Sequence, residues 1–138
     1  MAFTLPVTIR FQHCDPAGIV FYPRYFEMFN LVVEEWFEQV IGVGFNRLHY
    51  TEHLGVPMVR INTEFRAMSR LEDVVAFTLS VNGIGSSSVK CAIQAVCNEE
   101  IRLKAAFTLV CVDLNSSKAN PWPVEIRSKL ETCYEEDQ

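Results

Sequence analysis

One short segment of this chain, Asp15-Pro16-Ala17-Gly18 followed by Tyr22 and Pro23, holds residue types that could carry out acyl transfer. Asp15 lies between the end of a strand and a Pro-Ala-Gly turn, shortly before the expected start of a helix. Backbone N–H groups at a helix start lack intrahelical partners, so those near Tyr22 would polarise a carbonyl and stabilise an oxyanion formed from it. A carboxylate beside that carbonyl could attack it or activate water. On the residues alone, the alternative is that Asp15 caps the turn or the helix entrance.

A strand and a long helix flank this segment. Residues 7–11 alternate between apolar and polar types, which predicts a strand with one buried face. Residues 24–41 place their apolar side chains on an arc of roughly 180° when each residue advances about 100°. A surface helix shows a stripe of about 100°, so we expect a curved sheet to wrap this helix, which Gly42 ends. Leu31 and Ile41 fall on the polar arc, which indicates contact with another subunit or segment.

The rest of the chain is mostly strand with short connections. The fold class we predict is α+β, a long central helix wrapped by a curved antiparallel sheet of about five strands. A short helix over 45–54 is expected to end at Gly55, and a closing helix follows Pro123 over 124–134. The strands expected after the long helix are 58–67, 74–81, 89–96 and 101–112.

The composition describes a globular protein with more acidic than basic residues. The chain has 138 residues, of which 49% are hydrophobic and 21% charged, and its net charge is −5. This length predicts one domain, 1–138, whose core needs no disulfide or structural metal. The acidic balance argues against nucleic-acid binding. We expect a reduced, cytoplasmic protein, because no apolar run of membrane-spanning length and no signal-peptide pattern occur, and the five cysteines are an odd number.

Two blocks of the sequence resemble the 4-hydroxybenzoyl-CoA thioesterase family of hotdog-fold enzymes. The first block is Asp15-Pro16-Ala17-Gly18-Ile19-Val20-Phe21-Tyr22-Pro23 with Tyr25, and the second runs from Gly55-Val56-Pro57-Met58-Val59 through Asn62 and Phe65 to Glu72-Asp73-Val74. The similarity extends over nearly the whole chain and fades near Asn115. It implies the fold expected above and an acyl-CoA thioesterase, with CoA as part of the substrate. We expect no cofactor, and the spacing of the Cys and His residues indicates no metal site.

The resemblance also implies roles for individual residues. Asp15 is the catalytic carboxylate, acting as a nucleophile through an acyl-aspartyl anhydride or as a base for water. Tyr22 donates its backbone N–H to the thioester oxygen, and Gly18 allows a close approach in the turn. Family members form homo-oligomers, at least dimers and by resemblance tetramers, with the active site at the subunit interface. The residues implied to contact the acyl group are Phe21 and Asn30, with Pro57, Met58 and Val59 from the partner chain.

Two departures from the family pattern concern the substrate. Asn30 lies where the hydroxybenzoyl-specific member carries a carboxylate, so an aromatic acyl group of another kind or a short acyl group is as consistent as 4-hydroxybenzoyl. A solvated amide is the alternative for Asn30. Where that enzyme has a basic cluster for CoA, this chain has a glycine and three serines at 85–88. The candidates for binding CoA are therefore Arg66, Arg70, Ser87, Ser88 and Lys90, the charged ones being solvated surface charges in the alternative interpretation.

The three histidines give weaker indications of a catalytic or metal-binding role. His13 would orient Asp15 or point to solvent. His49 and His53 have i, i+4 spacing, but no Glu follows His49, so the zinc-protease pattern is absent. Two other functions stay open on the same fold. One is a hydratase or dehydratase of acyl thioesters, which would need a histidine converging on Asp15, and the other is a non-catalytic protein that binds acyl thioesters.

Overall fold

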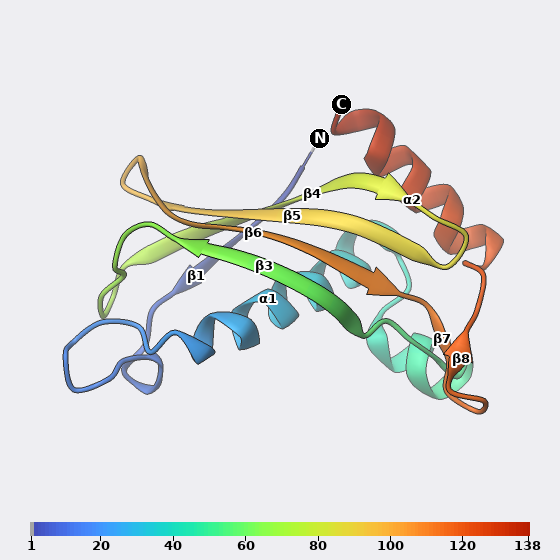
Figure 1. The fold of residues 1–138 in the computed structure, drawn as a ribbon, viewed down its shortest axis with the longest axis horizontal. Helices are drawn as coiled ribbons and strands as arrows, with labels where there is room; N and C mark the ends of the chain where they lie inside the picture. The colour runs from blue at the N-terminus through green and yellow to red at the C-terminus, as the bar shows by residue number, and fades with distance from the viewer. Residues whose placement is uncertain (1) are drawn as a thin grey trace.

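The computed structural model describes residues 2–138, which form a five-stranded antiparallel sheet curved around a long helix (Figure 1). The strand order is β1-β4-β5-β6-β3, and a small second sheet has the order β2-β7-β8. The elements in chain order are β1 (Phe3–Thr8), η1 (Phe11–His13), α1 (Pro23–Trp36), η2 (Phe37–Ile41), η3 (Arg47–Thr51), β2 (Leu54–Gly55), β3 (Met58–Phe65), β4 (Val74–Ile84), β5 (Ser88–Cys97), β6 (Glu100–Val110), β7 (Val112–Asp113), β8 (Lys118–Ala119) and α2 (Val124–Glu136).

Helix α1 forms because apolar residues recur at helical spacing after Pro23, whose missing N–H costs nothing at the first position of a helix. The helical segment continues through a π-helical turn, η2, and ends at Gly42, whose φ is 82°. The predicted helix over 24–41 and its glycine terminator are therefore confirmed. The residues of α1 that are buried against the sheet are Tyr25, Met28, Phe29, Val32, Val33 and Trp36.

The π-helical turn changes which side chains face the core. Ile41 is only 1% exposed, although a uniform helical wheel placed it on the polar arc. A π-helical turn forms i→i+5 bonds and so rotates less per residue, which carries Ile41 inward. Of the two contacts expected for Ile41, the structure shows the one with other segments of the same chain. Leu31 is 41% exposed in the single chain and stays an apolar side chain on the outer side of α1.

Three predicted boundaries differ from the structure. The first strand is β1, ending at Thr8, because residues 11–13 form a 3-10 turn instead of extending it. The helix predicted over 45–54 ends at Thr51, because residues 54–55 pair with β7 as a strand. The strand predicted over 101–112 divides at the buried Cys111 into β6 and β7. The other strands and the closing helix lie within three residues of their predicted bounds.

The sheet buries one face against α1, and β4 shows the alternation that achieves this. Its inward residues, Val75, Phe77, Leu79 and Val81, are buried, while the residues between them are partly exposed. The Phe77 ring meets the Phe29 ring of α1 edge-on at 6.3 Å. Burial of a side chain of this size contributes about 1.5–3 kcal/mol, so these layers hold α1 firmly in the sheet. No helix within residues 2–138 is long and apolar enough to cross a membrane.

The two outer strands of the large sheet differ in their capacity to accept another strand. β1 carries Pro6 in its interior, opposite Ala76 of β4. Proline has no N–H to offer a further strand and is typical of protected edges. β3 is eight residues long, lacks proline and pairs only with β6. The β3 edge is therefore the one that can be extended.

Candidate active site

The segment 14–20 forms a tight hairpin immediately before α1, in the blue part of the chain in Figure 1. The Asp15 N–H donates to the Ile19 carbonyl at 2.9 Å, and the Gly18 N–H donates to the Asp15 carbonyl at 2.9 Å. Gly18 has a φ of 80°, and a Cβ built there would meet no atom within 4 Å. In the single chain, glycine is thus required by the backbone conformation and not by a close contact.

The Asp15 side chain is partly exposed, and its two oxygens differ. Oδ1 accepts a hydrogen bond from the Ala17 N–H at 2.9 Å, which forms an Asx turn. Oδ2 accepts no hydrogen bond from residues 2–138. The turn-capping and catalytic interpretations are therefore compatible, because one oxygen fixes the carboxylate while the other stays available for reaction.

Tyr22 stands at the N-cap of α1, three residues after Ile19. The first turn of α1 is closed by the Arg24 N–H, which donates to the Phe21 carbonyl at 2.8 Å, and by the Tyr25 N–H, which donates to the Tyr22 carbonyl at 3.1 Å. The Tyr22 N–H has no acceptor within residues 2–138. An unpaired donor at the positive end of a 14-residue helix can stabilise negative charge on an oxygen.

His13 does not contact Asp15 through a hydrogen bond. Its Nδ1 accepts the Arg10 N–H at 2.8 Å, which closes the 3-10 turn η1. Partial burial lowers the pKa of the imidazole, opposed by the nearby Glu27. The ring is therefore held as a neutral acceptor for the backbone. His13 is therefore not bonded to Asp15, and its partly exposed ring closes the turn η1 instead.

A buried cation that the sequence analysis missed supports the hairpin. Arg102 of β6 is 7% exposed, and its Nη1 donates to the Asp73 carboxylate at 2.8 Å, to the Met68 carbonyl at 2.9 Å and to the Ser69 hydroxyl at 3.1 Å. The Ser69 carbonyl in turn accepts the Val20 N–H at 2.9 Å. Arg102 thus anchors the loop between β3 and β4, and this loop holds the returning arm of the hairpin.

The same loop connects to the start of α1. Burial raises the pKa of the Tyr25 hydroxyl, and the Ser69 side chain beside it partly offsets this rise. Hydrogen bonds from Arg102 and from the Arg70 N–H hold the pKa of Asp73 below its usual value. The only sequence signal for this network was a lone arginine in an otherwise apolar part of a strand.

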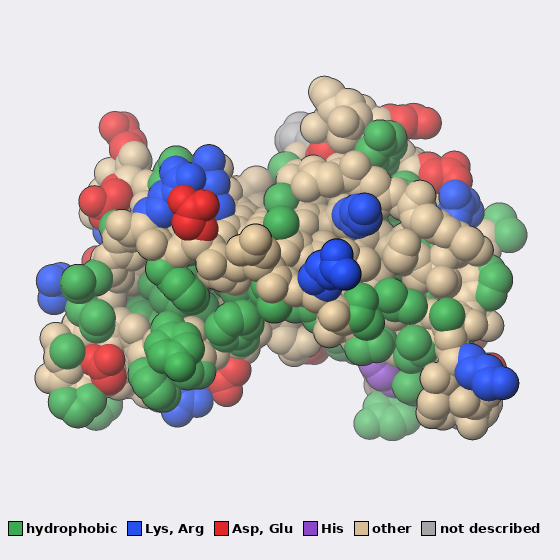
Figure 2. Space-filling view, viewed as in Figure 1, with side chains coloured by type: hydrophobic (Ala, Val, Ile, Leu, Met, Phe, Trp, Pro, Cys, Tyr) green, Lys and Arg blue, Asp and Glu red, His purple; other side chains and the backbone are tan. Residues whose placement is uncertain are grey.

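A cavity of about 500 Å³, here called the Tyr22 cavity, opens between the hairpin, the start of α1 and the end of β3. The Tyr22 and Tyr25 rings approach Phe65 of β3 at centroid distances of 6.4 and 5.7 Å. Figure 2 shows hydrophobic side chains gathered on the surface over this region. Four large side chains around the cavity are 46–62% exposed in the single chain, namely Phe21, Tyr22, Phe65 and Met68.

A second cavity, of about 520 Å³ and here called the Asn30 cavity, lies along α1 beside the small sheet. It brings together three residues of the predicted acyl site, Asn30, Pro57 and Met58. Val59 is 59% exposed and Phe21 is 46% exposed, and neither lines it. The lining residues are Phe26, Asn30, Val33, Phe45, His49, Gly55, Val56, Pro57, Met58, Leu109, Val112 and Leu114.

The predicted CoA-binding residues fall into two groups in a single chain. Arg66 lines the Tyr22 cavity, and Arg70 forms a bridge with Ile19 of the hairpin. The other three lie around the turn between β4 and β5, at the far end of the 11-residue strand β4. At about 3.3 Å per residue this strand is roughly 33 Å long, so one chain does not bring all five residues together. The residues of the far group are Ser87, Ser88 and Lys90.

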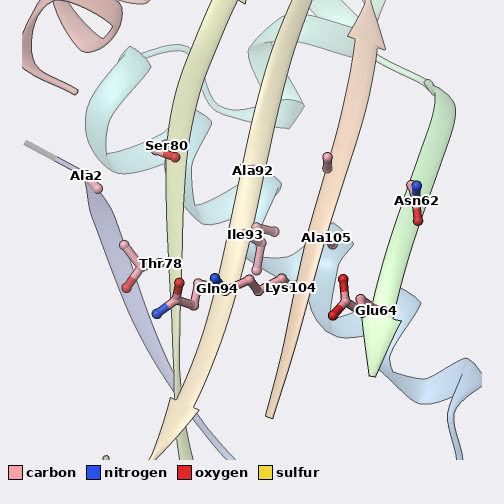
Figure 3. A pocket seen from close by; sticks show the side chains of 11 residues that line it. Ala2, Asn62, Glu64, Thr78, Ser80, Ala92, Ile93, Gln94, Lys104 and Ala105 are labelled. Atoms are coloured by element: carbon pink, nitrogen blue, oxygen red, sulfur yellow. The ribbon is translucent and has the colours of Figure 1, made fainter. Parts of the chain in front are cut away.

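A third hollow, of about 540 Å³, lies on the face of the sheet that points away from α1 (Figure 3). Figure 3 shows Thr78, Gln94 and Lys104 projecting from neighbouring strands on this face. None of the predicted catalytic or acyl-binding residues lines it. The candidate active site is thus at the α1 side of the sheet.

A long helix wrapped by a curved antiparallel sheet, with a carboxylate hairpin at the helix start, defines a hotdog-fold domain of the thioesterase type. The chain belongs to the Thioesterase-like superfamily, whose profile matches residues 9–130. The resemblance seen in the sequence and the predicted hotdog fold are confirmed.

Individual relatives agree with this assignment over most of the chain. A 1,4-dihydroxy-2-naphthoyl-CoA hydrolase of Nostoc punctiforme is 26% identical over 132 residues, covering 96% of this chain and 88% of the relative. Acyl-CoA thioesterase YbgC of Haemophilus influenzae is 20% identical over 126 residues, covering 91% and 92%. A Staphylococcus aureus protein solved in complex with CoA has the same fold, with a TM-score of 0.91, 13% identity and coverage of 100% and 86%.

Proposed function

We propose that this protein is an acyl-CoA thioesterase that hydrolyses an aromatic or short acyl-CoA to the free acid and CoA. The observation that carries the proposal is the presence, in one short segment, of a hairpin carboxylate with one unengaged oxygen at Asp15 and an unpaired N–H at Tyr22, where α1 begins. The relatives named for 1,4-dihydroxy-2-naphthoyl-CoA and acyl-CoA hydrolysis support the thioester class. Coenzyme A enters as part of the substrate.

The chemistry needs few groups. The Tyr22 N–H donates to the thioester oxygen, which becomes negatively charged when the carbonyl carbon is attacked. Oδ2 of Asp15 is either the attacking atom, giving a mixed anhydride that water then opens, or the base that deprotonates the attacking water. In both routes the C–S bond breaks and the thiolate of CoA leaves. Thiols have pKa values of about 8.5, so the leaving group needs no dedicated acid.

The β3 edge provides the subunit contact that the site requires. Antiparallel pairing of two β3 strands about a two-fold axis places the start of one strand beside the end of the other. The partner subunit's Met58 then lies beside Phe65, which contacts Tyr22 and Tyr25. This arrangement covers the exposed apolar cluster around the Tyr22 cavity and joins it to the partner's Asn30 cavity.

The same two-fold axis brings the separated CoA candidates closer together. Lys90 stands opposite Thr108, which in turn stands opposite Arg60 at the start of β3. In the pair, this end of the partner's sheet approaches the end that carries Arg66 and Arg70. We therefore propose at least a dimer, with the CoA phosphates held by basic side chains of both subunits.

A hydratase or dehydratase and a non-catalytic binding protein would need different residues near Asp15 from those that a thioesterase needs. A hydratase or dehydratase would need a histidine facing Asp15, but the His13 ring is engaged by the Arg10 N–H. A non-catalytic binding protein would not need the carboxylate at all. Replacement of Asp15 separates the thioesterase from this binding protein.

The test is thiol release from a panel of aromatic and aliphatic acyl-CoAs by wild type and by Asp15→Asn. The asparagine keeps an oxygen for the Ala17 N–H, so the turn persists while the charge is lost. We expect kcat to fall at least 100-fold, within the range of about 10²–10⁴ for a lost acid–base group, with KM little changed. Retention of turnover in Asp15→Asn would contradict the proposal.

A matched control exists at Asp113, whose Oδ1 accepts the Asn115 N–H at 2.8 Å in a turn of the same kind. Asp113→Asn makes the same chemical change away from the hairpin. We expect it to retain wild-type kcat. An equal loss in both variants would show that the effect came from turn structure and not from the carboxylate of Asp15.

A further inference from the structure

We propose that Ser69 is a positioning residue for the thioesterase reaction, because it holds the hairpin that carries Asp15 and the helix start that carries Tyr22 in one fixed arrangement. This role rests on the proposed function, since it concerns the two groups that act on the thioester. Ser69 lies in the loop between β3 and β4, far from both groups in the sequence, and no motif assigned it a role.

The Ser69 side chain is buried, which is unusual for serine. The residue is 1% exposed. A buried hydroxyl is costly unless it forms hydrogen bonds. Nη1 of Arg102 donates to this hydroxyl at 3.1 Å. Because a serine hydroxyl can donate one hydrogen bond while it accepts another, its proton is still available to a second partner.

Two different parts of Ser69 hold the two parts of the site. Its carbonyl accepts the Val20 N–H at 2.9 Å, and Val20 lies in the returning arm of the hairpin that carries Asp15. Its side chain lies beside the Tyr25 hydroxyl, and both residues line the Tyr22 cavity. Tyr25 belongs to the first turn of α1, three residues after Tyr22. One buried residue therefore connects the arm behind the carboxylate to the turn behind the N–H donor.

The position of Ser69 is fixed in turn by a buried cation. Besides the Ser69 hydroxyl, Nη1 of Arg102 contacts the Met68 carbonyl at 2.9 Å and the Asp73 carboxylate at 2.8 Å, which lie on either side of Ser69 in the sequence. Movement of the loop would break contacts to a buried charge, which is strongly unfavourable. The loop is thus a rigid support against which the hairpin and α1 are both placed.

This placement matters because the reaction needs three atoms in line. Oδ2 of Asp15 or its water must reach the carbonyl carbon while the Tyr22 N–H reaches the thioester oxygen. A misplacement of about 1 Å can slow a reaction about 100-fold. Loss of the Ser69 hydroxyl leaves the bond from its carbonyl to Val20 but removes the link to α1. The Tyr22 cavity keeps its walls, so the chemical step should suffer more than substrate binding.

The experiment measures kcat and KM of Ser69→Ala with the acyl-CoA that wild type hydrolyses fastest. We expect kcat to fall about tenfold, the value of one good hydrogen bond, with KM little changed. Tyr25→Phe removes the other hydroxyl of the pair and should lower kcat by a similar factor. The double variant should be no slower than the slower single variant, because both changes remove the same contact.

Two control variants separate positioning from a general loss of stability. Thr78→Ala also removes one hydroxyl–hydroxyl hydrogen bond, the one to Thr4 at 2.9 Å, on the face of the sheet that points away from α1 (Figure 3). Ile126→Val removes one methyl group from the core beneath α2, which lowers stability by about as much as a lost hydrogen bond. Both should keep the wild-type kcat at a temperature where thermal unfolding shows every variant to be folded.

The positioning role is overturned if Ser69→Ala keeps the wild-type kcat, raises KM alone, or loses no more kcat than Ile126→Val. It is also overturned if the losses in the double variant multiply, because the two hydroxyls would then act separately. Failure of the thioesterase proposal looks different. In that case wild type releases no thiol from any acyl-CoA, or Asp15→Asn remains active whatever the state of Ser69.

Discussion

Replacement of Arg102 by methionine should destabilise the protein much more than the loss of an exposed ion pair. Methionine fills much of the same volume but removes the ion pair with Asp73 and the hydrogen bonds to Met68 and Ser69. The Arg102 side chain is 8% exposed, and that of Asp73 is 25% exposed. Removing one partner of a buried pair costs about 3–5 kcal/mol. Because water reaches part of Asp73, we expect the lower end, about 3 kcal/mol, or roughly 10 °C in Tm.

The stability lost in Arg102→Met should depend on pH, and the protonation of Asp73 determines the direction. Its pKa is lowered in the folded protein by Arg102 and the Arg70 N–H, so its contribution is present above its unfolded pKa, about 3.9, and is lost as pH falls through the lower folded value. The cost of Arg102→Met should therefore be largest near pH 7 and shrink toward pH 3.

Urea unfolding at pH 7 and pH 3 measures the stability cost of Arg102→Met and its change with pH. Arg24→Met is the control, because its ion pair with Glu27 joins side chains that are 44% and 66% exposed. Exposed ion pairs contribute about 0–1 kcal/mol, so we expect Arg24→Met to cost no more than about 1 kcal/mol. A cost below 1 kcal/mol for Arg102→Met, or one that stays constant between the two pH values, would refute the reasoning.

Three further changes test other parts of the structure. Gly18→Ala forces a side chain to adopt a φ of 80° and should cost about 1–2 kcal/mol in thermal unfolding. His13 has a lowered pKa, so wild type should lose stability as pH falls from 7 to 5, and His13→Asn should lose less over that range in denaturant titrations. Val59→Lys places a charge on the open β3 edge and should raise the dimer dissociation constant at least tenfold in light scattering; an unchanged dimer would exclude pairing through β3.

The fold could be predicted because two periodicities in the sequence are strong. The wide apolar arc of α1 required a sheet around it, and the alternating strands supplied that sheet. The errors came from features that periodicity does not encode. A π-helical turn carried Ile41 inward, and pairing with β4 fixed β1 at 3–8 instead of 7–11. The pairing of β1 with β4 depends on residues distant in the sequence, and the i→i+5 bonds of the π-helical turn depart from the uniform helical period.

The candidate site was predictable only where it is local. Asp15 and Gly18 belong to one hairpin, and Tyr22 follows it at the start of α1, so neighbouring residues in the sequence were enough to indicate all three. The support from Arg102 spans more than eighty residues of sequence and could not be inferred from spacing. The division of the CoA candidates between two ends of the sheet also needs the strand order. The spacing of His49 and His53 bears only on metal binding, whereas the place of His49 beside Asn30 in one cavity follows from the tertiary fold.

The unequal edges of the large sheet also limit how far it can grow. A sheet with two open edges can add chains at both sides and polymerise without end, as fibrils do. Here Pro6 closes one side, so a second copy joining at β3 consumes the remaining open edge of both molecules. Addition through strand pairing then ends at two chains, which gives a concentrated solution of this protein a finite particle instead of a growing fibre.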